Sequence, residues 1–147
     1  TSYHTPGNEI TGTSVNHAEK IINIDDLLIS NAFLANIDEA KKKFGDDNVQ
    51  FVDIRDVREL EREGTIPGAL HAPRGMLEFW VDPDSPYFKP VFAEEKQFIL
   101  YCQSSWRSAL ATATLQDMGL NDVCHFEGGY GNWKKSGGAT QARQRKS

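Results

Sequence analysis

One stretch of the chain places a cysteine, an arginine and three serines within seven residues, and these groups can do nucleophilic chemistry on an anion. The stretch runs from Cys102 to Ser108 and includes Arg107. A thiolate is a strong nucleophile, and a nearby arginine lowers the pKa of a thiol by favouring its charged form. Turned backbone N–H groups can hold an anion beside it. The pattern predicts a reactive thiolate in an anion-binding loop; the alternative is an inert cysteine in the core, a common place for free cysteine.

The residues on either side predict a strand before this loop and a helix after it. An apolar run, 98–101, leads into Cys102, and a helical pattern covers 109–115 and extends to about Met118. The thiol would then lie beside a helix N-terminus, where unpaired N–H groups carry partial positive charge. The predicted elements therefore favour the thiolate interpretation.

Predicted strands and helices alternate through most of the chain. Apolar or β-branched runs predict strands at 20–24, 49–55 and 122–126 in addition to 98–101. Helices are predicted over 33–44, after a capping box formed by Asp56 and Glu59, and around Trp133. This alternation predicts an α/β fold with a mainly parallel central sheet flanked by helices. Ligands of such sheets bind beyond the carboxyl ends of the strands, where Cys102 and Arg55 are both expected.

Length and composition are those of one globular domain with polar ends. We expect a flexible lead-in over 1–18, the domain over 19–138 and a flexible basic tail over 139–147. The net charge of −5 argues against nucleic acid and anionic membranes as partners. No apolar run approaches the roughly 20 residues that span a bilayer. Two cysteines without a Cys-x-x-Cys motif favour a reducing compartment such as the cytoplasm, with a removed leader left open.

Three motifs resemble the signatures of the rhodanese sulfurtransferase family and follow the family's order. They are 53–59 with 64–71, then 102–107, then 127–137. The resemblance covers about residues 20 to 138. It implies a rhodanese-like domain, and it implies transfer of sulfane sulfur, as in a thiosulfate sulfurtransferase.

The length of the cysteine loop distinguishes two chemistries. Cys102 through Arg107 are six residues. Family members that transfer sulfur have a six-residue loop, whereas the related dual-specificity phosphatases have a seven-residue loop that is wide enough for phosphate. The count favours sulfur, and a phosphatase or arsenate reductase is the less favoured alternative.

One loop position departs from the family, since Ser105 stands where glycine is usual. Left-handed backbone angles there would cost a residue with a Cβ about 1 kcal/mol or more. We expect Ser105 either to strain or reshape the loop or to add a hydroxyl donor to it.

The resemblance also implies roles for individual residues. Cys102 would attack the outer sulfur of a small anionic donor such as thiosulfate, and it would carry a persulfide until a thiol or cyanide accepts the sulfur. Arg107 would stabilise the thiolate and the anion. Donor-binding groups are expected from the rest of the loop, namely Gln103, Ser104, Ser105, Trp106 and Ser108. The indole of Trp106 would form a wall of the pocket or pack against the core.

Residues outside the loop have more than one interpretation. Arg55 either contacts the anionic donor or forms a salt bridge with Glu59. Cys124 and His125 are too few to hold a metal and are expected in the core, so neither a metal nor another cofactor is predicted. A second functional hypothesis is a sulfur-relay or regulatory protein-binding module with little turnover, which would receive persulfide from a partner protein.

Overall fold

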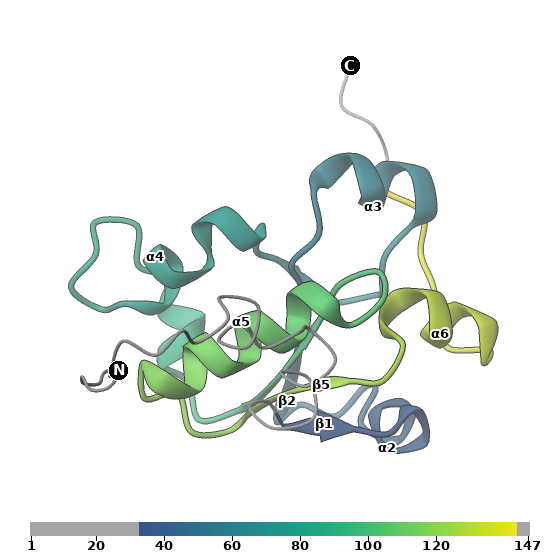
Figure 1. Cartoon of the computed structure of the whole chain (residues 1–147), viewed down its shortest axis with the longest axis horizontal. Helices are drawn as coiled ribbons and strands as arrows, with labels where there is room; N and C mark the ends of the chain where they lie inside the picture. Colours follow the sequence, from purple (N-terminus) through teal and green to yellow (C-terminus); the bar gives the residue numbers. More distant parts are fainter. Residues whose placement is uncertain (1–32, 144–147) are drawn as a thin grey trace, which may run out of the picture.

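A five-stranded parallel sheet, in the order β1-β5-β4-β2-β3, carries the domain in the computed structural model, which describes residues 33–143 (Figure 1). Every strand pair in the sheet is parallel. The strands are β1 (Leu34–Ala35), β2 (Val49–Asp53), β3 (Leu70–His71), β4 (Gln97–Tyr101) and β5 (Val123–Phe126). The three longest strands lie side by side in the middle, because their apolar side chains are buried on both faces. The mainly parallel α/β fold predicted from the sequence is confirmed.

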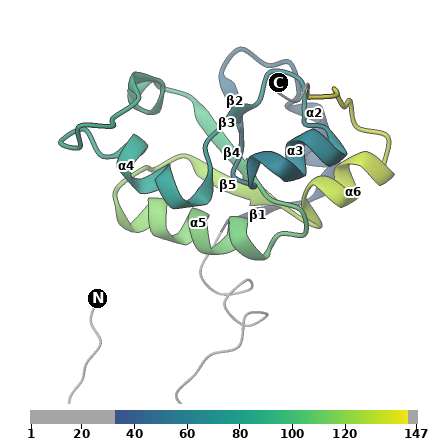
Figure 2. The same cartoon turned by 90° about the horizontal axis from the view of Figure 1, so that it is seen from above.

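Helices cover both faces of the sheet (Figures 1 and 2). One face packs against α4 and α5 through Leu77, Ala111 and Leu115. The other packs against α2 and α6 through Ala40 and Trp133. The helices are α2 (Ile37–Lys42), α3 (Val57–Glu63), α4 (Leu77–Val81), α5 (Trp106–Asp117) and α6 (Gly129–Lys135), with short 3₁₀ turns η3 (Arg74–Met76) and η4 (Pro90–Ala93).

The helix predicted over 33–44 is shorter than expected. Asn36 begins it by accepting a hydrogen bond from the backbone of Glu39, whose side chain accepts one from the Asn36 backbone in return. The residues before Asn36 form β1, which pairs with His125 and Phe126 of β5. A strand partner that is distant in sequence therefore overrides the helical spacing. The capping box predicted at Asp56 and Glu59 is present at the start of α3.

Residues 139 and 141, in the predicted flexible tail, contact the domain, and the flexibility of the tail stays a prediction. The Trp133 indole N–H donates to the Ala139 carbonyl at 2.7 Å. Thr65 and Gln141 form an antiparallel bridge, with N–O distances of 2.8 Å in both directions. The predicted lead-in over 1–18, the strand at 20–24 and the last four residues lie outside the described residues.

Within 33–143, no helix has the length and hydrophobicity to cross a membrane.

Candidate active site

The carboxyl ends of β2 and β4 meet at one edge of the sheet, where Cys102 directly follows β4. Asp53 and Tyr101 are partners in register, and the Ile54 N–H donates to the Tyr101 carbonyl at 3.0 Å. The residues after both strands therefore lie next to each other, as the sequence predicted. Arg55 and the cysteine loop approach each other in this region.

The Cys102 sulfur lies below the first turn of α5. The side chain is 1% exposed, and the Ser108 backbone N–H donates to its Sγ at an N–S distance of 3.4 Å. The Ser108 hydroxyl lies 3.6 Å from the same sulfur. Because the first N–H groups of a helix have no partner within the helix, this N–H is free to donate a hydrogen bond to the sulfur. One donor, the Ser108 backbone N–H, thus reaches the sulfur, whereas the Ser108 hydroxyl accepts from the thiol and donates to the Ser105 carbonyl at 3.2 Å.

Ser108 connects this thiol to a histidine that the sequence predicted only as core. The Ser108 Oγ lies 3.2 Å from Nδ1 of His125, which is 1% exposed. Alternation along β5 turns His125 toward α5 and Cys124 toward the opposite face. That alternation is visible in the sequence, but the contact with Ser108 depends on how α5 packs.

Cys124 itself is a buried core residue, as expected. Burial raises the pKa of its thiol to about 11. Among the described residues, no group of three or more histidine, cysteine, aspartate or glutamate side chains could hold a metal ion.

Ser105 adopts the left-handed backbone conformation that favours glycine, with φ of 83°. The strain expected at this position is therefore present. Its hydroxyl donates to the Phe126 carbonyl of β5 at 2.9 Å. The hydroxyl thereby ties the loop to the neighbouring strand, and its predicted contact with a bound anion stays a prediction.

Arg107 forms an ion pair with Glu59 of α3, and its two terminal nitrogens lie 2.7 and 2.9 Å from the two carboxylate oxygens. These hydrogen bonds raise the pKa of Arg107, and the negative charge of a Cys102 thiolate raises it further. By the same interaction Arg107 favours the thiolate. Glu59 therefore partners Arg107, and its predicted salt bridge with Arg55 is wrong.

Arg55 lies beneath the loop, and its buried side chain forms hydrogen bonds and a ring contact there. Its Nε and Nη2 donate to Asp53 at 2.9 and 2.7 Å, and Nη2 also donates to the Gly64 carbonyl at 2.7 Å. The guanidinium lies over the ring of Tyr130, 4.2 Å from its centre. Its Nη1 donates to Gln103 Oε1 at 3.1 Å, and the guanidinium also lies 5.7 Å from the centre of the Tyr101 ring. The predicted contact of Arg55 with a donor is not supported, because the side chain supports the base of the loop.

The other predicted loop residues divide between its base and its rim. Gln103 faces inward through its bond to Arg55. Ser104 and Trp106 are exposed, with 54% of Trp106 accessible. The indole therefore stands at the outer rim, where an incoming molecule would meet it.

The Gly128-Gly129 pair lets the start of α6 approach the loop closely. The N–H groups of Tyr130 and Gly131 donate to the carbonyls of Cys102 and Gln103 at 2.8 and 3.1 Å. A Cβ at Gly129 would lie 2.5 Å from the Cys102 carbonyl oxygen, and φ of Gly129 is 60°. Glycine at this position is thus required by the position of the loop.

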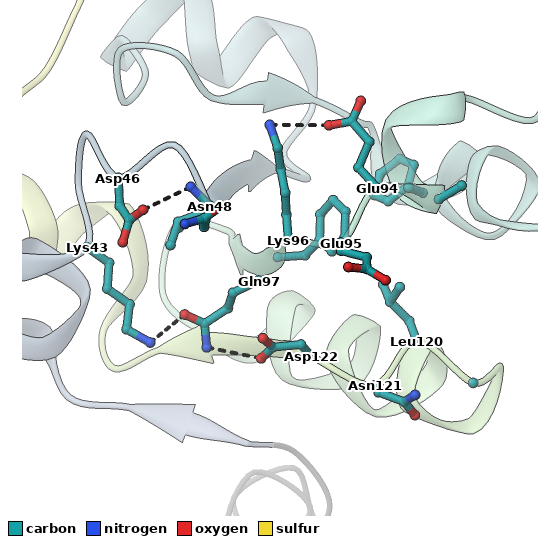
Figure 3. Close-up of a pocket in the computed structure, with 15 residues that line it drawn as sticks. Lys43, Asp46, Asn48, Glu94, Glu95, Lys96, Gln97, Leu120, Asn121 and Asp122 are labelled. Carbon is teal, nitrogen blue, oxygen red and sulfur yellow. Dashed lines mark hydrogen bonds and ion pairs between the residues drawn. The ribbon is translucent and has the colours of Figure 1, made fainter.

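A hollow of about 610 Å³ lies at the opposite end of the strands (Figure 3). It is lined by residues at the amino ends of β2 and β4, including Asn48 and Gln97. Its polar groups bond to one another: Gln97 contacts Lys43 and Asp122, and Lys96 pairs with Glu94 at 3.3 Å. The hollow is therefore separate from the thiol, which follows the carboxyl end of β4.

Comparison with protein families agrees with this arrangement. A family described as "Rhodanese-like domain" matches residues 36–136. A second family, described as "Major capsid protein", matches residues 1–47, less than half of the chain.

Individual relatives are named for more than one activity. Human thiosulfate:glutathione sulfurtransferase is 26% identical over 67% of this chain and 90% of its own. Thiosulfate sulfurtransferase 16 of Arabidopsis thaliana is 32% identical over 63% of this chain and 80% of its own. A solved structure from Rhodopseudomonas palustris is 47% identical, with a TM-score of 0.78, and covers 82% of this chain and 95% of its own. That protein is described as of unknown function and as a possible tyrosine phosphatase.

Proposed function

Since the chain belongs to the rhodanese-like family, we propose that it is a sulfurtransferase that carries sulfane sulfur as a persulfide on Cys102. The observation that carries the proposal is the position of the thiol under the first turn of α5. The Ser108 backbone N–H donates to its sulfur at 3.4 Å, the Ser108 hydroxyl lies 3.6 Å from it, and the charge of Arg107 interacts with it. A negatively charged sulfur, either thiolate or persulfide, suits this environment.

The reaction has two displacement steps. The Cys102 thiolate attacks the outer sulfur of thiosulfate, a sulfur–sulfur bond forms at Cys102, and sulfite leaves with the electron pair of the bond that breaks. A thiolate or cyanide then attacks the outer sulfur of the persulfide, and the Cys102 thiolate leaves. No general base is needed when the thiol is already ionised, and no cofactor takes part.

We expect the donor to be held at Arg107. The Arg107 side chain is 41% exposed, so a small anion can approach its positive charge from solvent. A thiol acceptor, or a protein that relays sulfur, would arrive over the rim formed by Ser104 and Trp106. Free Cys102 and Cys124 are consistent with a reducing compartment such as the cytoplasm.

A phosphatase is the second candidate, because the Rhodopseudomonas palustris relative at 47% identity is described as a possible tyrosine phosphatase. The six-residue span from Cys102 to Arg107 argues against it, since the related phosphatases use a longer loop. Hydrolysis of an aryl phosphate that requires Cys102 would favour this candidate.

The test is the mass of the intact protein after incubation with thiosulfate and then with cyanide. We expect wild type to gain the mass of one sulfur and to lose it with cyanide. Cys102→Ala should gain none, whereas the matched control Cys124→Ala should behave as wild type. If no sulfur is gained from thiosulfate but a persulfide donor protein loads Cys102, the relay hypothesis replaces turnover. If neither loads the protein and wild type hydrolyses p-nitrophenyl phosphate, the proposal is wrong.

A further inference from the structure

Three buried side chains form a chain of contacts from the thiol to β5. Ser108 Oγ lies 3.6 Å from Cys102 Sγ and 3.2 Å from His125 Nδ1. In this structure the same hydroxyl donates to the carbonyl of Ser105 at 3.2 Å. His125 and Ser108 are fully buried, so water does not compete for these contacts.

The single hydroxyl proton of Ser108 can serve only one of its three neighbours at a time. If His125 Nδ1 is an acceptor, it takes this proton, and the sulfur keeps only the Ser108 backbone N–H. If Nδ1 carries a proton, it donates to Ser108 Oγ and leaves the hydroxyl proton for the sulfur or for the Ser105 carbonyl. A charged sulfur is the stronger of those two acceptors. The tautomer of His125 therefore decides whether the hydroxyl stabilises a thiolate.

The burial of His125 indicates which tautomer is present. Its Nε2 is buried without a hydrogen-bond partner among the described residues. A proton on Nε2 would bury an unpaired N–H, whereas a proton on Nδ1 leaves only an unpaired acceptor there, and orphaned donors are the rarer case.

His125 does not act as the base that removes the thiol proton. Burial alone lowers the pKa of His125 to about 4, so the imidazole is neutral over the pH range in which thiols ionise. Its neighbours in register, Leu34 of β1 and Leu100 of β4, carry no titratable group. A neutral imidazole can orient a hydroxyl without gaining or losing a proton.

We propose that His125 is a positioning residue for the sulfur chemistry. Its Nδ1–H donates to Ser108 Oγ and thereby directs the Ser108 hydroxyl toward the charged sulfur of Cys102. This inference rests on the proposed function and adds to it a residue on β5 that does not touch the donor. Neither the motifs nor the loop length pointed to this residue.

The test is the pH–rate profile for alkylation of Cys102 by iodoacetamide, read by peptide mass. This profile reports the thiol pKa whether or not the protein transfers sulfur. The charged groups near Cys102 are Arg107, its partner Glu59 and the Asp53–Arg55 pair, and all of them are kept in every variant. The variants are His125→Phe, which removes the donor, and His125→Asn, whose side-chain amide can donate from a similar position. Each is made with and without Ser108→Ala.

We expect His125→Phe to slow the alkylation of Cys102 at pH 7 by about three- to tenfold, the effect of losing one hydrogen bond to the reacting sulfur. His125→Asn should restore most of the rate, and in the Ser108→Ala background neither change should shift the profile further. An equal shift in both backgrounds, or none in either, would overturn the proposal.

A measurement on wild type covers the case in which the variants do not fold. Nitrogen-15 NMR of the His125 ring should find the proton on Nδ1, and a proton on Nε2 would overturn the inference. Failure of the proposed function is seen separately, as absence of sulfur on Cys102 in the mass experiment. If the protein gains sulfur but the His125 and Ser108 substitutions act independently on alkylation, the proposed function stands and only the positioning role of His125 is refuted.

Discussion

Arg107 of α5 and Glu59 of α3 form a two-point ion pair between these helices, with nitrogen–oxygen distances of 2.7 and 2.9 Å. The same Glu59 carboxylate accepts the backbone N–H of Asp56 at 3.0 Å and so completes the capping box of α3. One side chain therefore begins a helix and fixes the arginine of the cysteine loop. This shared use links the motif at 53–59 physically to the motif at 102–107.

The first prediction concerns the pH dependence of stability. The hydrogen bonds from Arg107 hold the pKa of Glu59 below its ordinary value. Such a group contributes stability that is present above the unfolded pKa, about 4.3, and is lost as the pH falls through the lower folded pKa. Glu59→Gln should therefore unfold more easily than wild type at pH 7, by about 0.5–1 kcal/mol for this partly exposed pair.

Urea unfolding between pH 7 and pH 3 measures this effect. The difference in the free energy of unfolding between wild type and Glu59→Gln should become smaller below about pH 4.3. Glu94→Gln, which alters the ion pair with Lys96, is the matched control. Its free energy of unfolding should keep the pH dependence of wild type. A constant difference at every pH would contradict the role of the ion pair.

The second prediction concerns the charge beside the thiol. Arg107→Gln removes a cation that favours the thiolate and leaves the Glu59 carboxylate unpaired nearby. Both changes disfavour a negative sulfur, so the alkylation of Cys102 at pH 7 should become slower, by about tenfold. Alkylation rates measured against pH report it. Arg58→Gln, at an exposed position on α3 paired with Asp56, should leave the profile as in wild type. An equal shift in both variants would show that only overall charge matters.

Local signals in the sequence predicted much of the fold and the centre of the site. The apolar run before Cys102, the capping box at Asp56 and the helix after Arg107 depend on residues close together in the chain. The helix start at Asn36 was missed, because the residues before it pair with β5, which is about ninety positions away.

The pairing of charges was not predictable in the same way. Arg55 and Arg107 both lie near Glu59. Only the placement of α3 against α5 decides that Glu59 forms its ion pair with Arg107. Arg55 instead pairs with Asp53, two residues before it, in a buried site against the ring of Tyr130. His125 reads as a core residue from its neighbours on β5, and its contact with Ser108 requires the packing of α5 on that strand.

The third prediction separates strain from hydrogen bonding at Ser105. Ser105→Ala keeps the left-handed backbone strain and loses the bond to the Phe126 carbonyl, so it should destabilise the protein by about 1–2 kcal/mol. Ser105→Gly also loses the bond but relieves strain of about 1 kcal/mol, so it should have nearly wild-type stability. Urea unfolding at pH 7 measures the relative stabilities of wild type and the two variants. Equal stability of the alanine and glycine variants would mean that the backbone angle carries no cost.

The fourth prediction concerns the close approach of α6 to the cysteine loop. Gly129 and Gly137 both have positive φ, 60° and 86°, but their surroundings differ. A Cβ at Gly129 would lie 2.5 Å from the Cys102 carbonyl oxygen and 2.8 Å from the Gln103 carbonyl carbon, whereas a Cβ at Gly137 meets nothing within 4 Å. Gly137→Ala should therefore cost only the backbone strain, about 1 kcal/mol. Gly129→Ala should cost about 1–3 kcal/mol more, because backbone atoms of the loop must move.

Two measurements on this pair distinguish a local from a general effect. Urea unfolding gives the two stabilities, and alkylation of Cys102 reports the position of the loop. Gly129→Ala should change the rate of alkylation, because the displaced carbonyls belong to the residues that place the sulfur under α5. Gly137→Ala should keep the wild-type rate despite its own loss of stability. If the two variants alter alkylation equally, then α6 does not hold the loop, and the signature at 127–137 serves the fold alone.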